Sequence, residues 1–193
     1  MFEWQAWLYC AAILACVAAV GIYFLRNNRE FLLRRFEYRE KEASQKKIVA
    51  WTAIPYVFVY IAPGLDKRFG WSNVPPEHSL AALAIVLLGY WIIFLSFKEN
   101  AYAARTIRVE KHQTTISTGP YAVVRHPMYL GVLLMLLATP VALGSYWATL
   151  AFLPLPYLLS LRATDEERIL KRDLKGYQQY CRKVKWRILP GIW

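Results

Sequence analysis

Residues 121–131 read YAVVRHPMYLG, at the point where a charged segment meets a long apolar stretch. Residues 128–161 contain no Asp, Glu, Lys or Arg. Arg125, His126 and Pro127 therefore stand together at the edge of a hydrophobic block, where ionisable side chains are costly unless they have a partner or a task. This run is the first candidate for a binding site.

Pro127 lacks an amide hydrogen and has a fixed φ, which suits the first turn of a helix. We expect the amides of Met128 and Tyr129 to be unpaired at the positive end of this helix, where carboxylate and phosphate groups bind. Arg125 adds a fixed charge there, and His126 adds a hydrogen-bonding ring. Two structural alternatives stay open: Arg125 reaches lipid phosphates, and His126 caps the helix.

A second cluster, residues 162–167 (RATDEE), begins where the apolar stretch ends. Thr164 and Glu167 have the spacing of a capping box, which leaves Glu166 without a structural role. In the functional interpretation, Glu166 binds an ammonium group, and Arg162, one helical turn earlier, binds a carboxylate. Together with the preceding helix end, these charges suit an amino-acid zwitterion.

Four long apolar blocks must position the two clusters. Three of them, residues 4–25, 48–65 and 80–97, carry no formal charge and are long enough to cross a hydrocarbon core of roughly 30 Å. The fourth, 128–161, is too long for one crossing, so we expect a hairpin of two short spans that turns at Gly144-Ser145. The sequence therefore predicts an all-α integral membrane protein with about five transmembrane helices.

The basic residues indicate how these spans are oriented. Of the 24 Lys and Arg residues, 22 fall in segments 26–47, 98–127 and 162–193, which share one side of the membrane in this scheme. By the positive-inside rule that side is cytoplasmic, so the N-terminus faces outward and the C-terminus is cytoplasmic, in the inner (cell) membrane if the source is bacterial. We divide the chain into an N-terminal part with three spans, 1–97, and a catalytic part, 98–193, formed by a cytoplasmic loop, the hairpin and a cytoplasmic tail.

Amphipathic segments are predicted next to the spans. Residues 26–47 mix charge with apolar side chains and are typical of a helix in the headgroup region. Apolar residues in the tail recur at spacings of four and three, and we expect this face to fold back over the mouth of the hairpin, although Gly176 interrupts it. The residues of this face are Leu170, Leu174, Tyr177, Cys181 and Val184.

Composition and motifs argue against several other classes of protein. The formal charge of +11 lies beside the spans rather than on a separate module, so we expect membrane lipids and not nucleic acid as partners. No GxGxxG or P-loop motif supports a Rossmann-type nucleotide site. Three scattered histidines do not support a metal site, and the three cysteines are more typical of packing residues than of a disulfide framework.

The two clusters together resemble a known family. RHPMYLG, a hydrophobic stretch and Glu166-Glu167 are similar to the RHPxYxG, hydrophobic, EE signature of the isoprenylcysteine carboxyl methyltransferases and the related phospholipid methyltransferases. Gly119-Pro120-Tyr121, Tyr177, Tyr180 and Leu189-Pro190 also fit the pattern of that family. The resemblance covers about residues 98–193.

This resemblance implies an integral membrane enzyme that uses S-adenosyl-L-methionine. Arg162 matches the position that engages the substrate, and we assign Arg162 and Arg125 as catalytic. Two residues depart from the family pattern: Thr115 replaces a larger aliphatic residue, and Gly176 stands where an acidic residue is common. The residues expected to bind the cofactor are Gln113, Thr114, Thr115, Ile116, Tyr121, His126, Pro127, Met128, Tyr129 and Glu166.

The implied chemistry agrees with the charges. Methyl transfer from a sulfonium is an in-line displacement, so the protein mainly aligns the reactants and excludes water. A carboxylate acceptor is ionised at neutral pH and needs no general base. We therefore expect O-methylation of a lipophilic acceptor that enters from the bilayer, most simply a prenylcysteine-like or isoprenoid carboxylate, whereas Tyr121 and Tyr129 favour the sulfonium charge.

Two other functions stay open at this point. Membrane sterol reductases, which use NADPH, have a similar C-terminal half with an ending like residues 186–193 (WRILPGIW). Their chains have many more spans, and the present chain provides little room for a sterol cavity. In the third hypothesis the protein is a non-enzymatic membrane accessory subunit, and Arg125 and Glu166 form only a structural ion pair.

Overall fold

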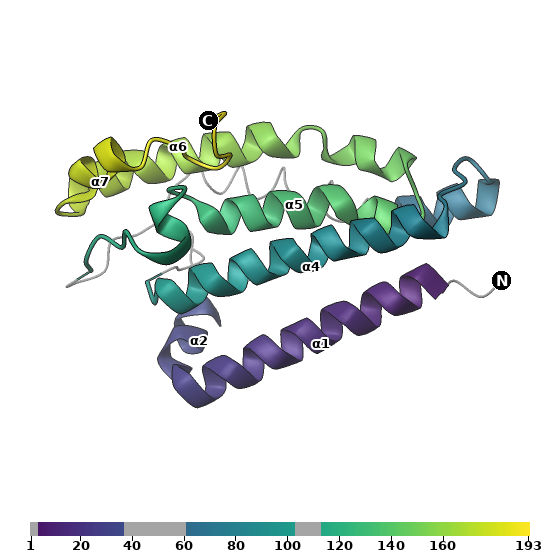
Figure 1. Cartoon of the computed structure of the whole chain (residues 1–193), viewed down its shortest axis with the longest axis horizontal. Helices are drawn as coiled ribbons and strands as arrows, with labels where there is room; N and C mark the ends of the chain where they lie inside the picture. Colours follow the sequence, from purple (N-terminus) through teal and green to yellow (C-terminus); the bar gives the residue numbers. More distant parts are fainter. Residues whose placement is uncertain (1–3, 37–60, 103–112) are drawn as a thin grey trace.

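The computed structural model describes residues 4–36, 61–102 and 113–193. Every regular element within these ranges is an α-helix or a 3-10 helix, which confirms the predicted all-α class for this part of the chain. Residues 61–69 are helical as well. The labelled elements (Figure 1) are α1 (Trp4–Asn27), α2 (Arg29–Phe36), α4 (Pro76–Glu99), η1 (Gly119–Ala122), α5 (Pro127–Ala142), η2 (Trp147–Phe152), α6 (Leu155–Asp173) and α7 (Tyr177–Lys183).

Two of the described helices are long and apolar enough to cross a membrane. α1 and α4 each have 24 residues, and their most apolar windows have mean hydropathies of 2.4 and 2.5. They coincide with the predicted spans 4–25 and 80–97. The predicted span 48–65 lies mostly outside the described residues, and α5, with 16 residues, is shorter than the roughly 20 that a crossing needs. The total of five spans and the membrane hairpin therefore stay predictions.

α4 and α5 form the centre of the bundle and lie side by side along most of their length (Figure 1). Each begins with a proline in its first turn, Pro76 and Pro127, which costs no internal hydrogen bond at that position. Gly89 and Gly131 meet where the two helices cross. A Cβ atom on Gly89 would lie 2.6 Å from the carbonyl oxygen of Gly131, so the close approach depends on glycine.

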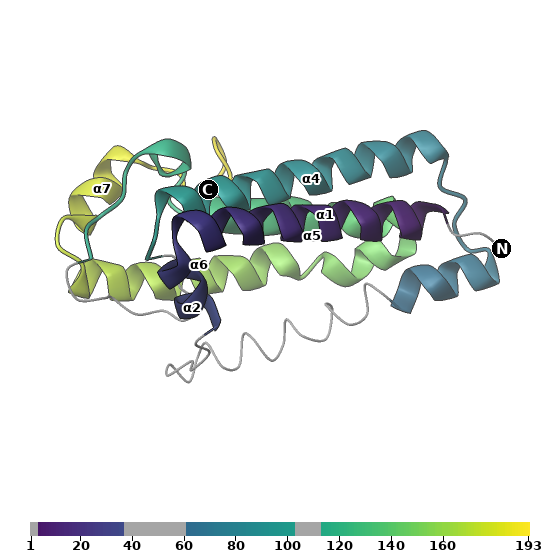
Figure 2. The same cartoon turned by 90° about the horizontal axis from the view of Figure 1, so that it is seen from below.

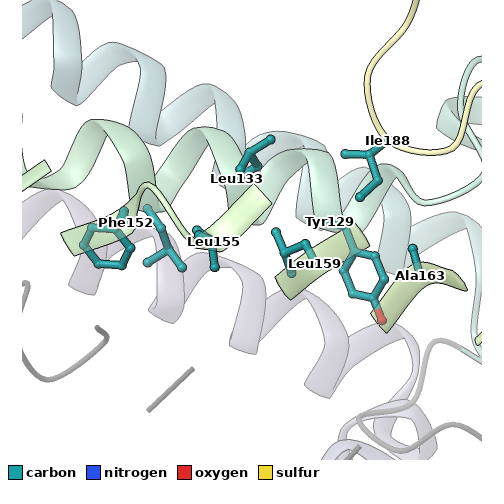
Figure 3. Close-up of a cluster of buried hydrophobic side chains, with 8 residues drawn as sticks. Tyr129, Leu133, Phe152, Leu155, Leu159, Ala163 and Ile188 are labelled. Carbon is teal, nitrogen blue, oxygen red and sulfur yellow. The ribbon is translucent and has the colours of Figure 1, made fainter. Parts of the chain in front are cut away.

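α5 and α6 are joined by a turn followed by η2, and they pack against each other. Gly144, with a φ of +87°, occupies the left-handed region in this turn, which only glycine adopts without strain. α6 then continues without interruption from its apolar first half into the charged segment 162–167. Figure 3 shows most of the buried side chains between these elements, which are Tyr129, Leu133, Leu136, Phe152, Leu155, Leu159, Ala163 and Ile188.

A polar cluster fixes the same turn at the far end of the bundle. The Asp66 side chain is buried, and its carboxylate accepts hydrogen bonds from the amide and the hydroxyl of Ser72, each at 2.6 Å. The Ser145 hydroxyl also donates to this carboxylate. These donors satisfy the buried carboxylate. Through them, Asp66 links the segment before α4 to the turn after α5.

The predicted tail face exists, but it is divided between two helices. α6 ends at Asp173, Gly176 has a φ of +86°, and α7 begins directly after it. Leu174 and the residues of α7 that face it pack around Tyr121, which belongs to η1. The break at Gly176 therefore lets the tail turn back over the start of α5, as Figure 2 shows at the end of the bundle occupied by α7.

α2 makes up most of the described part, residues 26–36, of the predicted interfacial segment 26–47. Its Phe31 side chain is buried and packs against the rings of Phe24, with centroids 4.6 Å apart, and of Phe97, at 5.3 Å. An aromatic cluster thus joins α1, α2 and the end of α4.

Candidate active site

One pocket opens at the end of the bundle where α5 begins and α6 ends. Its cavity volume is about 90 Å³. All twelve site residues predicted from the sequence line this pocket, although their roles stay predictions. They are Gln113, Thr114, Thr115, Ile116, Tyr121, Arg125, His126, Pro127, Met128, Tyr129, Arg162 and Glu166.

The Tyr129 hydroxyl connects the two charged groups of the pocket wall. It donates a hydrogen bond to Glu166 Oε2 at 2.7 Å and accepts one from Arg162 Nε at 3.0 Å. Arg162 and Glu166 are four residues apart on α6, so they project from one face of the helix. The wall therefore presents a carboxylate and a guanidinium next to each other, with a phenol between them.

His126 is buried beside Tyr129, and the two rings stack with centroids 5.4 Å apart and an interplanar angle of 11°. Its ring nitrogens lie 3.8 Å from Glu166 and 3.4 Å from Glu167. The side chain makes no capping hydrogen bond to α5, so the predicted capping role is wrong. The Tyr129 amide donates to the His126 carbonyl at 3.0 Å, and the expectation that this amide is unpaired is wrong as well.

Arg125 is held inside the protein by a buried carboxylate. Its Nε atom lies 2.6 Å from Glu167 Oε1, and one terminal nitrogen donates to the carbonyls of Val184 at 2.9 Å and Lys185 at 3.1 Å. The side chain is only 8% exposed, so the alternative in which it reaches lipid phosphates is wrong. The predicted ion pair between Arg125 and Glu166 is also wrong, because Glu167 is the partner.

Glu167 is the centre of this charge cluster. Lys171 Nζ and Arg187 Nε lie 3.1 and 3.4 Å from its second oxygen. Burial alone would raise the pKa of the Glu167 carboxyl, but the His126 ring and the Arg125 guanidinium outweigh burial and hold this pKa well below its usual range. The predicted capping box is wrong, because Thr164 lies inside α6 and its hydroxyl donates to the Ser160 carbonyl.

The last residues of the tail run along the start of α5. The amides of Arg125 and His126 donate to the carbonyls of Trp186 and Arg187 at 2.9 and 2.8 Å. The Arg187 guanidinium lies 4.8 Å from the ring centroid of Trp193, within the range of a cation–π contact. Backbone hydrogen bonds and the shared Glu167 therefore fix the tail against the pocket wall.

The two departures from the family pattern lie next to each other. The Thr115 hydroxyl donates to the Lys175 carbonyl at 2.9 Å, and a Cβ atom on Gly176 would lie 3.6 Å from that hydroxyl. A short polar side chain at 115 thus pairs with the tight turn at 176.

Comparison with known proteins identifies the family. Residues 78–175, about half of the chain, match the sequence model of the phospholipid methyltransferase family. The chain belongs to this family. The match confirms the resemblance drawn from the RHPMYLG and Glu166-Glu167 segments, and with it a membrane methyltransferase character.

Two curated relatives represent different activities. The chain is 40% identical over 76 residues to protein-S-isoprenylcysteine O-methyltransferase of Schizosaccharomyces pombe, which is 38% of this chain and 32% of that protein. It is 33% identical over 164 residues to Delta(14)-sterol reductase TM7SF2 of Mus musculus, which is 75% of this chain and 37% of that protein. The chain thus spans about a third of the length of either relative.

The pocket of this phospholipid methyltransferase family member includes residues that the sequence did not assign. Asn100 Nδ2 donates to the Tyr121 hydroxyl at 3.3 Å, and Asn100 Oδ1 accepts from the Tyr102 amide at 3.0 Å. No motif marks Asn100 in the sequence, since it simply follows an apolar block. The other unassigned lining residues are Tyr102, Leu170, Leu174, Tyr177 and Tyr180, of which the spacing of the tail had indicated most.

Tyr177 bears on whether the pocket fits a polar ligand. Its hydroxyl is buried and has no hydrogen-bond partner among the described residues. Burial, followed by the charges of Glu167 and Glu166, raises the pKa of this hydroxyl, so it stays protonated. Burying a hydroxyl without a hydrogen-bond partner costs free energy, and a ligand in the pocket would supply that partner.

Proposed function

We propose that the protein is a membrane-embedded methyltransferase that uses S-adenosyl-L-methionine and methylates a lipophilic acceptor. The observation that carries the proposal is the arrangement of Glu166, Tyr129 and Arg162 in a pocket of aromatic and polar residues. A carboxylate beside buried rings suits a ligand that carries both ammonium and sulfonium charge. The acceptor we favour is a prenylcysteine-like or isoprenoid carboxylate.

The residues present fit this cofactor. Glu166 would bind its ammonium group, and the Tyr177 hydroxyl and the polar side chains of residues 113–115 would bind its other polar groups. The rings of Tyr121 and Tyr129 would face its sulfonium. When bound, the cofactor supplies an electrophilic methyl group.

The chain itself aligns the acceptor and excludes water. Arg162 would orient an acceptor carboxylate, which is already ionised at neutral pH because its reference pKa is near 4. Arg125 would act through Glu167, keeping His126 and the tail in position rather than touching the acceptor. This refines the predicted catalytic role of Arg125 into a positioning role.

We place the pocket at the cytoplasmic side of the membrane. The described parts of the basic segments, residues 26–36, 98–102, 113–127 and 162–193, lie around this end of the bundle, which agrees with the positive-inside rule for a cytoplasmic face (Figure 1). A water-soluble cofactor would arrive from the cytoplasm, and a lipophilic acceptor from the bilayer.

A second candidate function follows from the longer of the two matches. The similarity to a sterol reductase covers 75% of this chain. It supports the alternative drawn from the sequence, a membrane reductase that would use NADPH. The two functions differ in the cofactor that the same pocket would bind.

A ligand titration tests the proposal. S-adenosylmethionine, S-adenosylhomocysteine and NADPH are added to the detergent-solubilised protein, and thermal unfolding is followed. Because a ligand that binds only the folded state raises its stability, the methyltransferase predicts stabilisation by the first two ligands alone. Stabilisation by NADPH alone would establish the reductase, and no response to any ligand would favour the accessory role.

Matched variants separate the roles of the two charged residues. Glu166→Gln should weaken cofactor binding, whereas Asp165→Asn, which removes the same charge from the neighbouring residue paired with Arg168, should not. Arg162→Ala should keep cofactor binding and lower turnover. Equal cofactor affinity in Glu166→Gln and in the wild type would contradict the assignment.

A further inference from the structure

The end of α4 holds the loop that carries Tyr121 at two points. The Thr118 hydroxyl donates a hydrogen bond to the Glu99 carboxylate, and Asn100 Nδ2 donates to the Tyr121 hydroxyl at 3.3 Å. Glu99 is the last residue of α4 and Asn100 follows it directly, whereas Thr118 precedes η1 and Tyr121 lies inside it. The Tyr121 amide also donates to the Thr118 carbonyl at 3.1 Å. Two consecutive residues of α4 and its cap therefore fix both ends of one hydrogen-bonded turn.

Gly119 lies between these two contacts and against the Glu99 side chain. Its φ of +56° falls in the left-handed region, which favours glycine. A Cβ atom on Gly119 would lie 3.1 Å from the Glu99 carboxylate. The glycine thus lets the turn approach this carboxylate closely, so packing as well as the hydrogen bond joins the turn to α4.

The orientation of the Asn100 side chain follows from its two hydrogen bonds. Its Oδ1 atom accepts from the Tyr102 amide at 3.0 Å, so Nδ2 is the group that faces Tyr121. Asn100 and both tyrosines line the candidate active site. Tyr121 is buried, and its carbonyl accepts from the Tyr180 hydroxyl at 2.7 Å. Tyr121 is therefore held from α4 at its hydroxyl and from the tail at its backbone.

We propose that Glu99 and Asn100 are positioning residues that hold the Tyr121 ring against the cofactor sulfonium. The proposal rests on the proposed function, and it adds how the pocket distinguishes the charged cofactor from its neutral product. S-adenosylmethionine carries a sulfonium, whereas S-adenosylhomocysteine carries a neutral thioether. Because the face of an aromatic ring attracts a cation, a ring held in place favours the cofactor over the product.

The ring of Tyr129, which would also face the sulfonium, is held in a different way. Its hydroxyl is hydrogen-bonded to Glu166 and Arg162 on α6, and neither residue at the end of α4 takes part in these bonds. Changes at the end of α4 should therefore move the Tyr121 ring and leave the carboxylate that would bind the ammonium group in place. Both ligands carry that ammonium group, so the difference between their affinities reports on the sulfonium contact.

The test measures the dissociation constants of S-adenosylmethionine and S-adenosylhomocysteine by calorimetry on the detergent-solubilised full chain. Glu99→Ala and Asn100→Ala should each weaken binding of the first ligand about fivefold more than binding of the second, which corresponds to a cation–π contact of about 1 kcal/mol. Glu99→Gln should behave as the wild type, because the glutamine oxygen still accepts from Thr118. An equal loss of affinity for both ligands would mean a merely structural role and would overturn the proposal.

A double-mutant cycle tests whether Asn100 acts through Tyr121. In a Tyr121→Phe background, Asn100→Ala should not change the ratio of the two dissociation constants further, because the hydroxyl that Asn100 binds is missing. An effect of the same size in both backgrounds would contradict the proposal. Asn27→Ala is the matched control, since Asn27 ends α1 and donates to the Tyr23 carbonyl within that helix, and it should leave the ratio unchanged.

The same titrations distinguish a failure of this proposal from a failure of the proposed function. A wild type that binds neither ligand would refute the proposed function, and the positioning role with it. A wild type that binds both ligands, with an unchanged ratio in Glu99→Ala and Asn100→Ala, would refute the positioning role alone.

Discussion

Gly89 and Gly131 bring the backbones of α4 and α5 into contact at the centre of the bundle. A Cβ atom on either residue would come within 2.6 Å of the carbonyl oxygen of the other. Gly131 belongs to the RHPMYLG motif, so this motif glycine serves helix packing, and the turn of α5 just before it, which contains Met128 and Tyr129, lines the pocket.

Gly89→Ala should therefore destabilise the protein by about 1–3 kcal/mol, the usual cost of overpacking a tight contact. Thermal unfolding in detergent measures this change. Gly21→Ala is the control, because a Cβ atom there meets nothing within 4 Å and Gly21 lies inside α1. An equal effect of both substitutions would contradict the packing role.

Tyr129→Phe should lower turnover at saturating cofactor without unfolding the protein. The hydroxyl links Glu166 to Arg162, and its loss removes two hydrogen bonds to charged groups. Because a hydrogen bond of this kind is worth at least about 1.5 kcal/mol, we expect kcat to fall about tenfold or more. An unchanged kcat would mean that the link plays no part in the reaction.

Tyr177→Phe should mainly weaken cofactor binding, whereas Tyr180→Phe should mainly lower the stability of the folded protein. The Tyr177 hydroxyl has no partner among the described residues, so its removal should raise the stability of the free protein slightly and weaken cofactor binding about fivefold, about 1 kcal/mol. The Tyr180 hydroxyl donates to the Tyr121 carbonyl at 2.7 Å, so its removal should lower stability. Unfolding and cofactor titrations of both variants decide the matter, and equal cofactor affinity in Tyr177→Phe would speak against the contact.

Glu167 should make stability depend on acid pH. Its pKa in the folded protein lies below the reference value near 4.3, so its stabilising contribution is complete above that value and is lost as the pH falls toward the folded pKa. Glu167→Gln should cost about 3–5 kcal/mol at pH 7, since it leaves Arg125 buried without a counter-ion. Unfolding measured from pH 7 to pH 3 should fall more steeply below about pH 4.5 in the wild type than in Glu167→Gln. Parallel curves would refute this origin of the acid sensitivity.

The sequence was most informative where composition and spacing act locally. The apolar blocks predicted α1 and α4, and the two charged motifs predicted residues that line one pocket. Spacing along α6 was sufficient to place Arg162 and Glu166 on one face, because a helix repeats every 3.6 residues.

Partners that lie far apart in the chain could not be predicted in the same way. Arg125 was expected to pair with Glu166 and pairs with Glu167, because the side of α6 that faces the start of α5 depends on how the two helices pack. Asn100 reaches the pocket only because α4 lies against α5, and nothing in its local sequence records that contact.

The pairing of Arg125 and His126 with Trp186 and Arg187 has a consequence for how the protein is made. During synthesis α4 and α5 leave the ribosome well before residues 184–187, so the helices can enter the membrane and pack while the wall of the pocket is still missing. A nascent chain at this stage would be inserted but inert, and binding competence would arise only after residues 184–187 have been synthesised.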